Sequence, residues 1–312
     1  MSKCFSITES RNWCLRSTFS KSGLRSTVTD LQDGTIMHCW VPKTRKESKP
    51  DLLLIHGFGT NAMWQWSELI PHLAPHFNIY LPDLVFFGNS YTTRPERTES
   101  FQAQCVMRVM EAQSVRRLSL VGLSYGGFVG YSMAAQFREV VEKVVICCAG
   151  VCLEEKDLRE GMFRVSDVEE AANILVPQTP DKLRELMRFA FLKPPTGLPS
   201  CLLNDFIDEM CTEYVEEKKD LLRSIARERK LSDVPKIPQP TLIIWGDYDQ
   251  IFPVELGHRL KRHLGENAQL VVIKNASHGF VIEKPKEFYK HLKSFLTDFQ
   301  PPSISPKTND HK

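Results

Sequence analysis

Ser124 is the residue whose surroundings best suit nucleophilic chemistry. It lies in the sequence VGLSYGG of residues 121–127, which contains the pattern G-x-S-x-G between an apolar run and a helix-compatible stretch. A sharp turn from strand to helix strains the serine backbone, and the turn needs flanking residues with almost no side chain, here Gly122 and Gly126. Such a turn lifts the hydroxyl into the open, and the helix N-terminus behind it favours developing negative charge.

A serine hydroxyl is a weak nucleophile and needs a base. His278 lies in the sequence NASHGF of residues 275–280, just after an apolar run that ends at Ile273. Loops at the carboxyl edge of a parallel sheet are where catalytic groups gather, so this histidine is the candidate base. The sequence WGDYDQIFP of residues 245–253 offers two carboxylates that could orient it, Asp247 and Asp249.

A further strand-end loop is predicted in the sequence LIHGFGT of residues 54–60. Its glycines allow the backbone to expose N–H groups, so the N–H groups of Phe58 and Tyr125 could converge as an oxyanion hole. His56 in this loop is expected to hydrogen-bond within the loop rather than to act as the base.

The elements that must position these residues alternate along the chain. Continuous apolar runs at 52–55, 78–81, 118–121, 144–148, 241–245 and 270–273 are typical of parallel strands covered on both faces. Helical patterns at 64–73, 100–110, 125–136, 254–263 and 285–299 separate or follow them. Asp33-Gly34, between the runs 27–31 and 35–40, is a hairpin signal. The alternation predicts an α/β fold with right-handed crossovers.

Residues 151–234 interrupt this rhythm, because they contain helical patterns such as 181–191 and 202–229 and no convincing strand. We expect a core formed by residues 25–150 and 235–299, with residues 151–234 inserted as a helical cap. Residues 1–24 are expected to be an N-terminal arm in solvent. Residues 300–312 are rich in Pro, Ser and Lys and are predicted to be a disordered tail.

Composition excludes several other classes of protein. The 312 residues are 42% hydrophobic and 25% charged, which is the mix of an ordinary globular chain. A formal net charge of +2 provides no strong field for nucleic acid, so no nucleic-acid partner is predicted. The longest uncharged apolar stretch, Val144 to Leu153, is half of the roughly 20 residues that a membrane span needs. No transmembrane helix is therefore predicted, although the stretch 187–195 leaves room for peripheral contact with a membrane.

The nine cysteines are scattered without a C-x-x-C pair or zinc-finger spacing, so they predict buried thiols rather than disulfides or metal ligands. No metal or other cofactor is expected, and nothing in the sequence indicates an oligomeric state.

Reduced thiols and the lack of an apolar segment after Met1 favour a cytoplasmic protein. Residues 1–29 are basic and rich in Ser and Thr, which leaves a plastid or other organelle as the alternative.

Together, the HGFG loop, the GLSYGG turn, the GDYDQIFP loop and the ASHGF loop resemble the α/β-hydrolase superfamily over roughly residues 25 to 299. The chain order Ser, Asp, His is also that of this superfamily. The resemblance implies a mostly parallel, eight-stranded sheet, and it implies that Asp249 is the acid of a Ser124-His278-Asp249 triad while Asp247 shapes the turn. It is similar to the esterase, monoacylglycerol-lipase and carbon–carbon-bond hydrolase branches and to plant members.

Two departures from the family's usual pattern bear on the substrate. Leu123 stands in the turn where many relatives have His, and Phe86 and Phe87 replace a more glycine-rich loop. The leading hypothesis is a serine hydrolase of carboxylic esters with an apolar, lipid-like acyl group. Among the apolar residues of the cap, those expected to bind substrate are Met162, Phe163, Phe189 and Phe191.

Two other hypotheses stay open, namely a carbon–carbon-bond hydrolase and a small-molecule receptor on the hydrolase fold. The HGFGT sequence resembles receptors of karrikin and strigolactone, whereas the GLSYGG turn and the charged cap resemble them less. Slow turnover with ligand-dependent partner binding would favour the receptor, and fast turnover of a simple ester would favour the enzyme.

Overall fold

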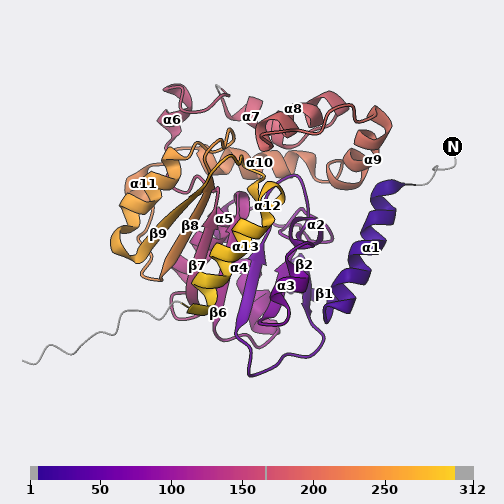
Figure 1. The fold of residues 1–312 in the computed structure, drawn as a ribbon, viewed down its shortest axis with the longest axis vertical. Helices are drawn as coiled ribbons and strands as arrows, with labels where there is room; N and C mark the ends of the chain where they lie inside the picture. Colours follow the sequence, from indigo (N-terminus) through magenta and orange to yellow (C-terminus); the bar gives the residue numbers. More distant parts are fainter. Residues whose placement is uncertain (1–5, 166, 299–312) are drawn as a thin grey trace, which may run out of the picture.

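The computed structural model describes residues 6–165 and 167–298. Its centre is one sheet in which eight strands follow the order β1-β2-β4-β3-β6-β7-β8-β9 (Figure 1). A two-residue strand, β5 (Tyr91–Thr92), pairs with β2 off this path. The eight strands are β1 (Leu24–Asp30), β2 (Thr35–Pro42), β3 (Asp51–Ile55), β4 (Asn78–Pro82), β6 (Leu118–Leu123), β7 (Val141–Cys147), β8 (Thr241–Gly246) and β9 (Ala268–Ile273).

The sheet is parallel from β4 through β9 and antiparallel at the β1–β2 end. Every residue of β3, β4, β6 and β8 is buried, which explains their unbroken apolar sequences. The β1–β2 hairpin turns at Asp33-Gly34 as its sequence predicted. The α/β fold with a mostly parallel sheet, expected from the sequence, is therefore confirmed.

Helices cover both faces of this sheet. In Figure 1, α13 lies in front of the sheet, whereas α4 and α5 lie behind it. The core helices are α2 (Ala62–Trp66), α3 (Ile70–Leu73), α4 (Glu99–Ala112), α5 (Tyr125–Gln136), α11 (Glu255–Leu264), α12 (Phe280–Glu283) and α13 (Pro285–Asp298). Because the strands from β3 to β9 run in parallel, the loops that leave them toward these helices meet at one edge of the sheet.

A group of helices inserted after β7 lies over this edge, at the top of Figure 1. They are α6 (Glu155–Arg159), α7 (Val168–Leu175), α8 (Pro180–Ala190), α9 (Ser200–Met210) and α10 (Val215–Ala226), followed by a short 3-10 turn at Leu231–Asp233. The pattern expected over 202–229 is two helices rather than one, since the chain turns at Tyr214, whose φ is 53°. In the part of the chain that the structure describes, residues 151–234 contain no strand.

The N-terminal segment differs from the expected solvent-exposed arm, because residues Ile7–Lys21 form helix α1. Ser6 caps the helix by accepting a hydrogen bond from the N–H of Glu9, a spacing that the sequence contained. Phe19 is fully buried and meets the Trp40 ring edge-on, with centroids 5.0 Å apart. At its other end, α1 reaches the cap, where the N–H and hydroxyl groups of Thr8 donate to Asp205 at 2.8 and 2.6 Å.

Residues 1–5 of the arm and the tail predicted at 300–312 lie outside the described residues. Within 6–165 and 167–298, no helix has both the length and the apolar character that a bilayer crossing requires.

Replacing Phe19 by Ala should destabilise the protein by about 3–5 kcal/mol, because a fully buried aromatic side chain is lost from the contact between α1 and the sheet. Trp13 on the same helix is 72% exposed, so Trp13→Ala should change the free energy of unfolding by less than about 0.5 kcal/mol. Urea and thermal unfolding of both variants measure the difference. Equal stability of the two variants would show that α1 is not part of the folded core.

Candidate active site

The turn between β6 and α5 holds Ser124 in a backbone conformation that L-residues rarely adopt, with φ 54° and ψ −122°. Its neighbours explain how the turn closes. A Cβ atom added to Gly122 would lie 2.2 Å from the carbonyl oxygen of Gly126, and one added to Gly126 would lie 2.4 Å from that of Ile55. Both glycines are therefore required by backbone packing, as the sequence pattern predicted.

The loop after β3 lies directly against this turn. A Cβ atom on Gly57 would approach the Cβ of Ser124 to 3.0 Å and the carbonyl oxygen of Leu123 to 3.1 Å. The rings of Phe58 and Tyr125 meet edge-on at 4.9 Å. The structure thus brings together the two residues whose N–H groups were predicted to converge, and the Tyr125 N–H, at the first position of α5, has no acceptor within its helix.

His56 in the same loop is fully buried and is engaged at both ring nitrogens. Its Nδ1 lies 2.8 Å from the carbonyl oxygen of Gly57, and its Nε2 accepts the N–H of Leu84 at 3.0 Å. Burial lowers the pKa of this imidazole, so the neutral ring is favoured. The predicted bond within the loop is therefore present at Nδ1, whereas Nε2 bonds a different segment, the one that follows β4.

His278 meets a carboxylate, and that carboxylate is Asp249. The Nδ1 of His278 lies 2.8 Å from Oδ2 of Asp249, whose side chain is fully buried. The other oxygen, Oδ1, accepts the backbone N–H groups of Ile251 and Phe252 at 2.9 Å each. An ionised carboxylate can only accept, so Nδ1 carries the proton and Nε2 presents a lone pair.

Asp247 has a different partner, although it lies only two residues earlier. Its Oδ1 accepts the backbone N–H of Ala276 at 3.2 Å, and its Oδ2 lies 3.9 Å from the ammonium group of Lys274. Asp247 therefore fastens the loop after β8 to the loop that carries His278. Among the described residues, no hydrogen bond links the Ser124 hydroxyl to His278, and such contacts often tighten only when substrate binds.

The cap is bonded to the histidine loop. The N–H of Gly279 donates to the carbonyl oxygen of Ala190 at the end of α8, at 2.7 Å. Glu283 accepts the N–H of Leu192 with one oxygen and the N–H of Ser277 with the other, each at 2.7 Å. The position of His278 consequently depends on the cap as well as on the sheet.

A buried thiol lies beside this pair and was missed as a neighbour of the site. Cys148, with φ 45°, follows β7 directly, and its Sγ lies within 4.8 Å of ligand atoms of Asp249 and His278. Burial and then the charge of Asp249 raise the pKa of the thiol well above its usual value, so the neutral thiol is favoured. These three groups could ligate a metal ion, although the sequence predicted none. The sequence could have indicated this position, because Cys148 follows a predicted strand at the edge where the catalytic loops meet.

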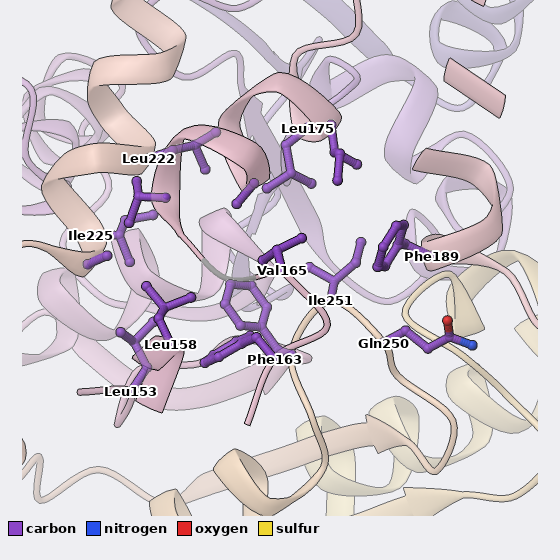
Figure 2. Close-up of a pocket in the computed structure, with 15 residues that line it drawn as sticks. Leu153, Leu158, Phe163, Val165, Leu175, Phe189, Leu222, Ile225, Gln250 and Ile251 are labelled. Carbon is purple, nitrogen blue, oxygen red and sulfur yellow. The ribbon is translucent and has the colours of Figure 1, made fainter. Parts of the chain in front are cut away.

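An apolar cavity of about 90 Å³ lies between the cap and the loop that carries Asp249 (Figure 2). Phe163 and Phe189, two of the four residues predicted to bind substrate, line it, and Ile251 and Phe252 form its wall on the core side. The Phe252 ring also lies 6.0 Å from the His278 ring. The full lining is Leu153, Leu158, Phe163, Val165, Val168, Ala171, Ile174, Leu175, Phe189, Leu222, Ile225, Ala226, Gln250, Ile251 and Phe252.

The other two predicted substrate contacts lie elsewhere. Phe191 packs against the histidine loop, where a Cβ atom on Gly279 would come within 2.5 Å of its ring. Met162 is partly buried against the main core. Neither residue lines the apolar cavity.

The unusual phenylalanines after β4 pack beside the HGFG loop. The Phe87 ring meets His56 at 5.1 Å and Phe58 at 5.0 Å, both edge-on. Phe86 has φ 76°, and its ring faces Tyr214 of the cap at 5.5 Å. This departure from the family pattern therefore supports the loop that carries Phe58 and contacts the cap.

Comparison with known proteins agrees with this geometry. The family model described as "Alpha/beta hydrolase family" matches residues 52–291. The monoacylglycerol lipase ABHD6 of Mus musculus is 27% identical over 277 residues, which are 83% of this chain and 79% of that protein. The 2-hydroxy-6-oxo-2,4-heptadienoate hydrolase of Pseudomonas putida is 27% identical over 262 residues, or 78% and 88% of the two chains.

Solved structures share the fold. A putative lipase from Acinetobacter baumannii AYE superposes with a TM-score of 0.79 at 20% identity, covering 96% of this chain and 98% of that one. A bacterial membrane phospholipase A superposes with a TM-score of 0.74 at 26% identity, covering 93% and 90%.

Proposed function

The chain belongs to the alpha/beta hydrolase family, and from that premise we propose that it is a serine hydrolase of carboxylic esters with an apolar acyl group. The family and the relatives support hydrolase activity. The observation that carries the narrower proposal is the bond between His278 and buried Asp249, made at the edge of the sheet where Ser124 is held in its strained turn.

In the proposed reaction, the Ser124 hydroxyl attacks the ester carbonyl and passes its proton to Nε2 of His278. Asp249 holds the imidazole in the required tautomer and stabilises the imidazolium. His278 then protonates the leaving alkoxide, and water releases the acid from the acyl-enzyme by the same route. The two N–H groups that Oδ1 of Asp249 accepts keep the carboxylate oriented throughout.

The N–H groups of Phe58 and Tyr125 are proposed to stabilise the negative oxygen that forms in this step. Gly57 brings the first loop against Ser124, and α5 begins with the second N–H group. Donors fixed before the reaction act where charge develops and need no reorganisation, so one such donor is worth roughly 10²–10³ in turnover.

The apolar cavity is the proposed acyl site. It adjoins His278 through Phe252, and among its described lining residues only Gln250 is polar. A cavity of about 90 Å³ with such walls favours a hydrocarbon chain over a polar group. The lipase name of the mouse relative is consistent with a lipid-like ester.

A carbon–carbon-bond hydrolase is the second candidate, because the Pseudomonas putida relative is named a 2-hydroxy-6-oxo-2,4-heptadienoate hydrolase and has the same 27% identity as the lipase. The substrate in that name, a dienoate, is an anion. Burying an anion requires a paired positive charge, and the described cavity lining contains no Lys or Arg. The cavity therefore favours the ester.

Exchanging the two aspartates for asparagine separates their roles. Asp249→Asn should lower turnover of a simple ester by about 10²–10⁴, because the amide presents the wrong face to Nδ1 of His278. Asp247→Asn keeps an acceptor oxygen for the Ala276 N–H and should cost less than about 10-fold. Steady-state kinetics on one ester, with melting temperatures as the control for folding, give the comparison. A crippled Asp247→Asn variant beside a normal Asp249→Asn variant would reverse the assignment.

Replacing Phe189 by Ala should change the preferred acyl length, because it enlarges the cavity beside the acid loop. Apolar contacts of this kind discriminate by about 1–3 kcal/mol, or about 10–200-fold in kcat/KM. Phe206 is the matched control, since this cap residue packs on Trp64 of the core helix α2 and does not line the cavity. The measurement is kcat/KM over a series of acyl lengths. An identical profile for wild type, Phe189→Ala and Phe206→Ala would mean that the acyl group binds elsewhere.

A further inference from the structure

A second group of serine, histidine and aspartate, which we call the relay, is linked by hydrogen bonds at the β1–β2 end of the sheet. The Ser26 hydroxyl lies 2.8 Å from Nε2 of His38, and Nδ1 of His38 lies 2.8 Å from Oδ2 of Asp83. Ser26 is on β1, His38 is on β2, and Asp83 directly follows β4. None of the three lines the apolar cavity.

The carboxylate of this relay is held in place from several sides. Oδ1 of Asp83 accepts the N–H of Ala62 at 2.9 Å. Gly88 passes so close that a Cβ atom there would lie 2.1 Å from Oδ2. Burial alone would raise the pKa of Asp83, but the hydrogen bond from His38 and the N–H of Ala62 act against it, so the pKa is lowered. The ionised carboxylate therefore fixes the proton of His38 on Nδ1 and leaves the Nε2 lone pair to accept from Ser26.

The serine of the relay is accessible to solvent, as a nucleophile must be, whereas the histidine and the aspartate are buried. His38 and Asp83 are each only 4% exposed, whereas Ser26 is exposed to solvent on the edge strand. In the β1–β2 register, Ser26 is opposite Trp40 and Val28 is opposite His38, so the serine and the histidine are diagonal neighbours on one face. A serine within hydrogen-bond reach of a base that a third group orients is the signature of an activated nucleophile.

The relay also faces a cavity. Ser26, His38 and Asp83 line a space of about 550 Å³, which is within the range of small-molecule sites. Two cationic side chains, Arg16 and the buried Lys218, are part of its walls. Besides Asp83, three further acidic residues line the same space, namely Asp208, Glu209 and Glu213. These polar walls distinguish the cavity from the apolar one beside His278.

We propose that Ser26 is a second nucleophilic serine, which is acylated by small polar esters and phosphorylated by dialkyl fluorophosphates of similar size, with fluoride as the leaving group. In the step, the Ser26 oxygen forms a bond to the carbonyl carbon while its proton moves to Nε2 of His38. The imidazolium then returns that proton to the alkoxide, which leaves as the alcohol. Asp83 stays ionised and stabilises the imidazolium, and Ser26 is left as an ester.

The test is covalent labelling with diisopropyl fluorophosphate, followed by intact mass measurement and peptide mapping. In the Ser124→Ala variant, one adduct is expected, and it maps to Ser26. General-base assistance contributes about 10²–10⁴-fold, so Ser26 should react at least about 100-fold faster than Ser232. Ser232 is the control within the same sample, because it is exposed and its hydroxyl donates to a carboxylate, Asp233, at 2.9 Å rather than to an imidazole.

Two further arms complete the experiment. The double variant Ser124→Ala, Ser26→Ala should take up no rapid adduct. The wild-type digest maps Ser124 and Ser26 together, so the result does not depend on the folding of a variant. If Ser26 reacts no faster than Ser232, the proposal fails, and the hydrogen bonds of the relay serve only to hold β1 and β2 together. An unlabelled Ser124 in the wild-type digest would refute the proposed function instead.

Discussion

The backbone at Ser124 is held at a positive φ by the packing of Gly122, Gly126 and Gly57 around it. In each case a Cβ atom would meet backbone or the serine itself at 3.0 Å or less. The strain is therefore stored where three chain segments converge and is maintained by buried parallel strands on either side. Since the turn fixes both the serine and the first N–H group of α5, the rest of the site has to form around that point.

The parallel sheet supplies the remaining groups at one edge, but it does not orient them by itself. Asp249 is oriented by the N–H groups of Ile251 and Phe252, and Asp247 joins its loop to the loop of His278. The cap adds bonds from α8 to the same loop. The wall of the apolar cavity and the position of His278 are thus coupled, because Ala190, which follows the lining residue Phe189, accepts the N–H of Gly279 next to His278.

The sequence predicted what local patterns encode, and it could not predict what only packing decides. The glycines of the turn, the apolar strands and the pairing of acid and histidine loops each have a short-range signature. Helix α1 was missed because its stability comes from Phe19 against Trp40 and from bonds to α9, contacts between distant segments. For the same reason, spacing could not separate Phe189 from Phe191 in the cap, or place Cys148 beside Asp249.

The central claim is that hydrolysis proceeds through an ester of Ser124. Mixing wild-type protein with a p-nitrophenyl ester, quenching in acid within the first turnover and mapping the acylated peptide by mass spectrometry tests it directly. The account predicts a burst of nitrophenol and an acyl group on Ser124, formed at the same rate. Two results would contradict it. One is release of nitrophenol while Ser124 stays unmodified throughout the first turnover, and the other is acylation of a different residue at the rate of the burst.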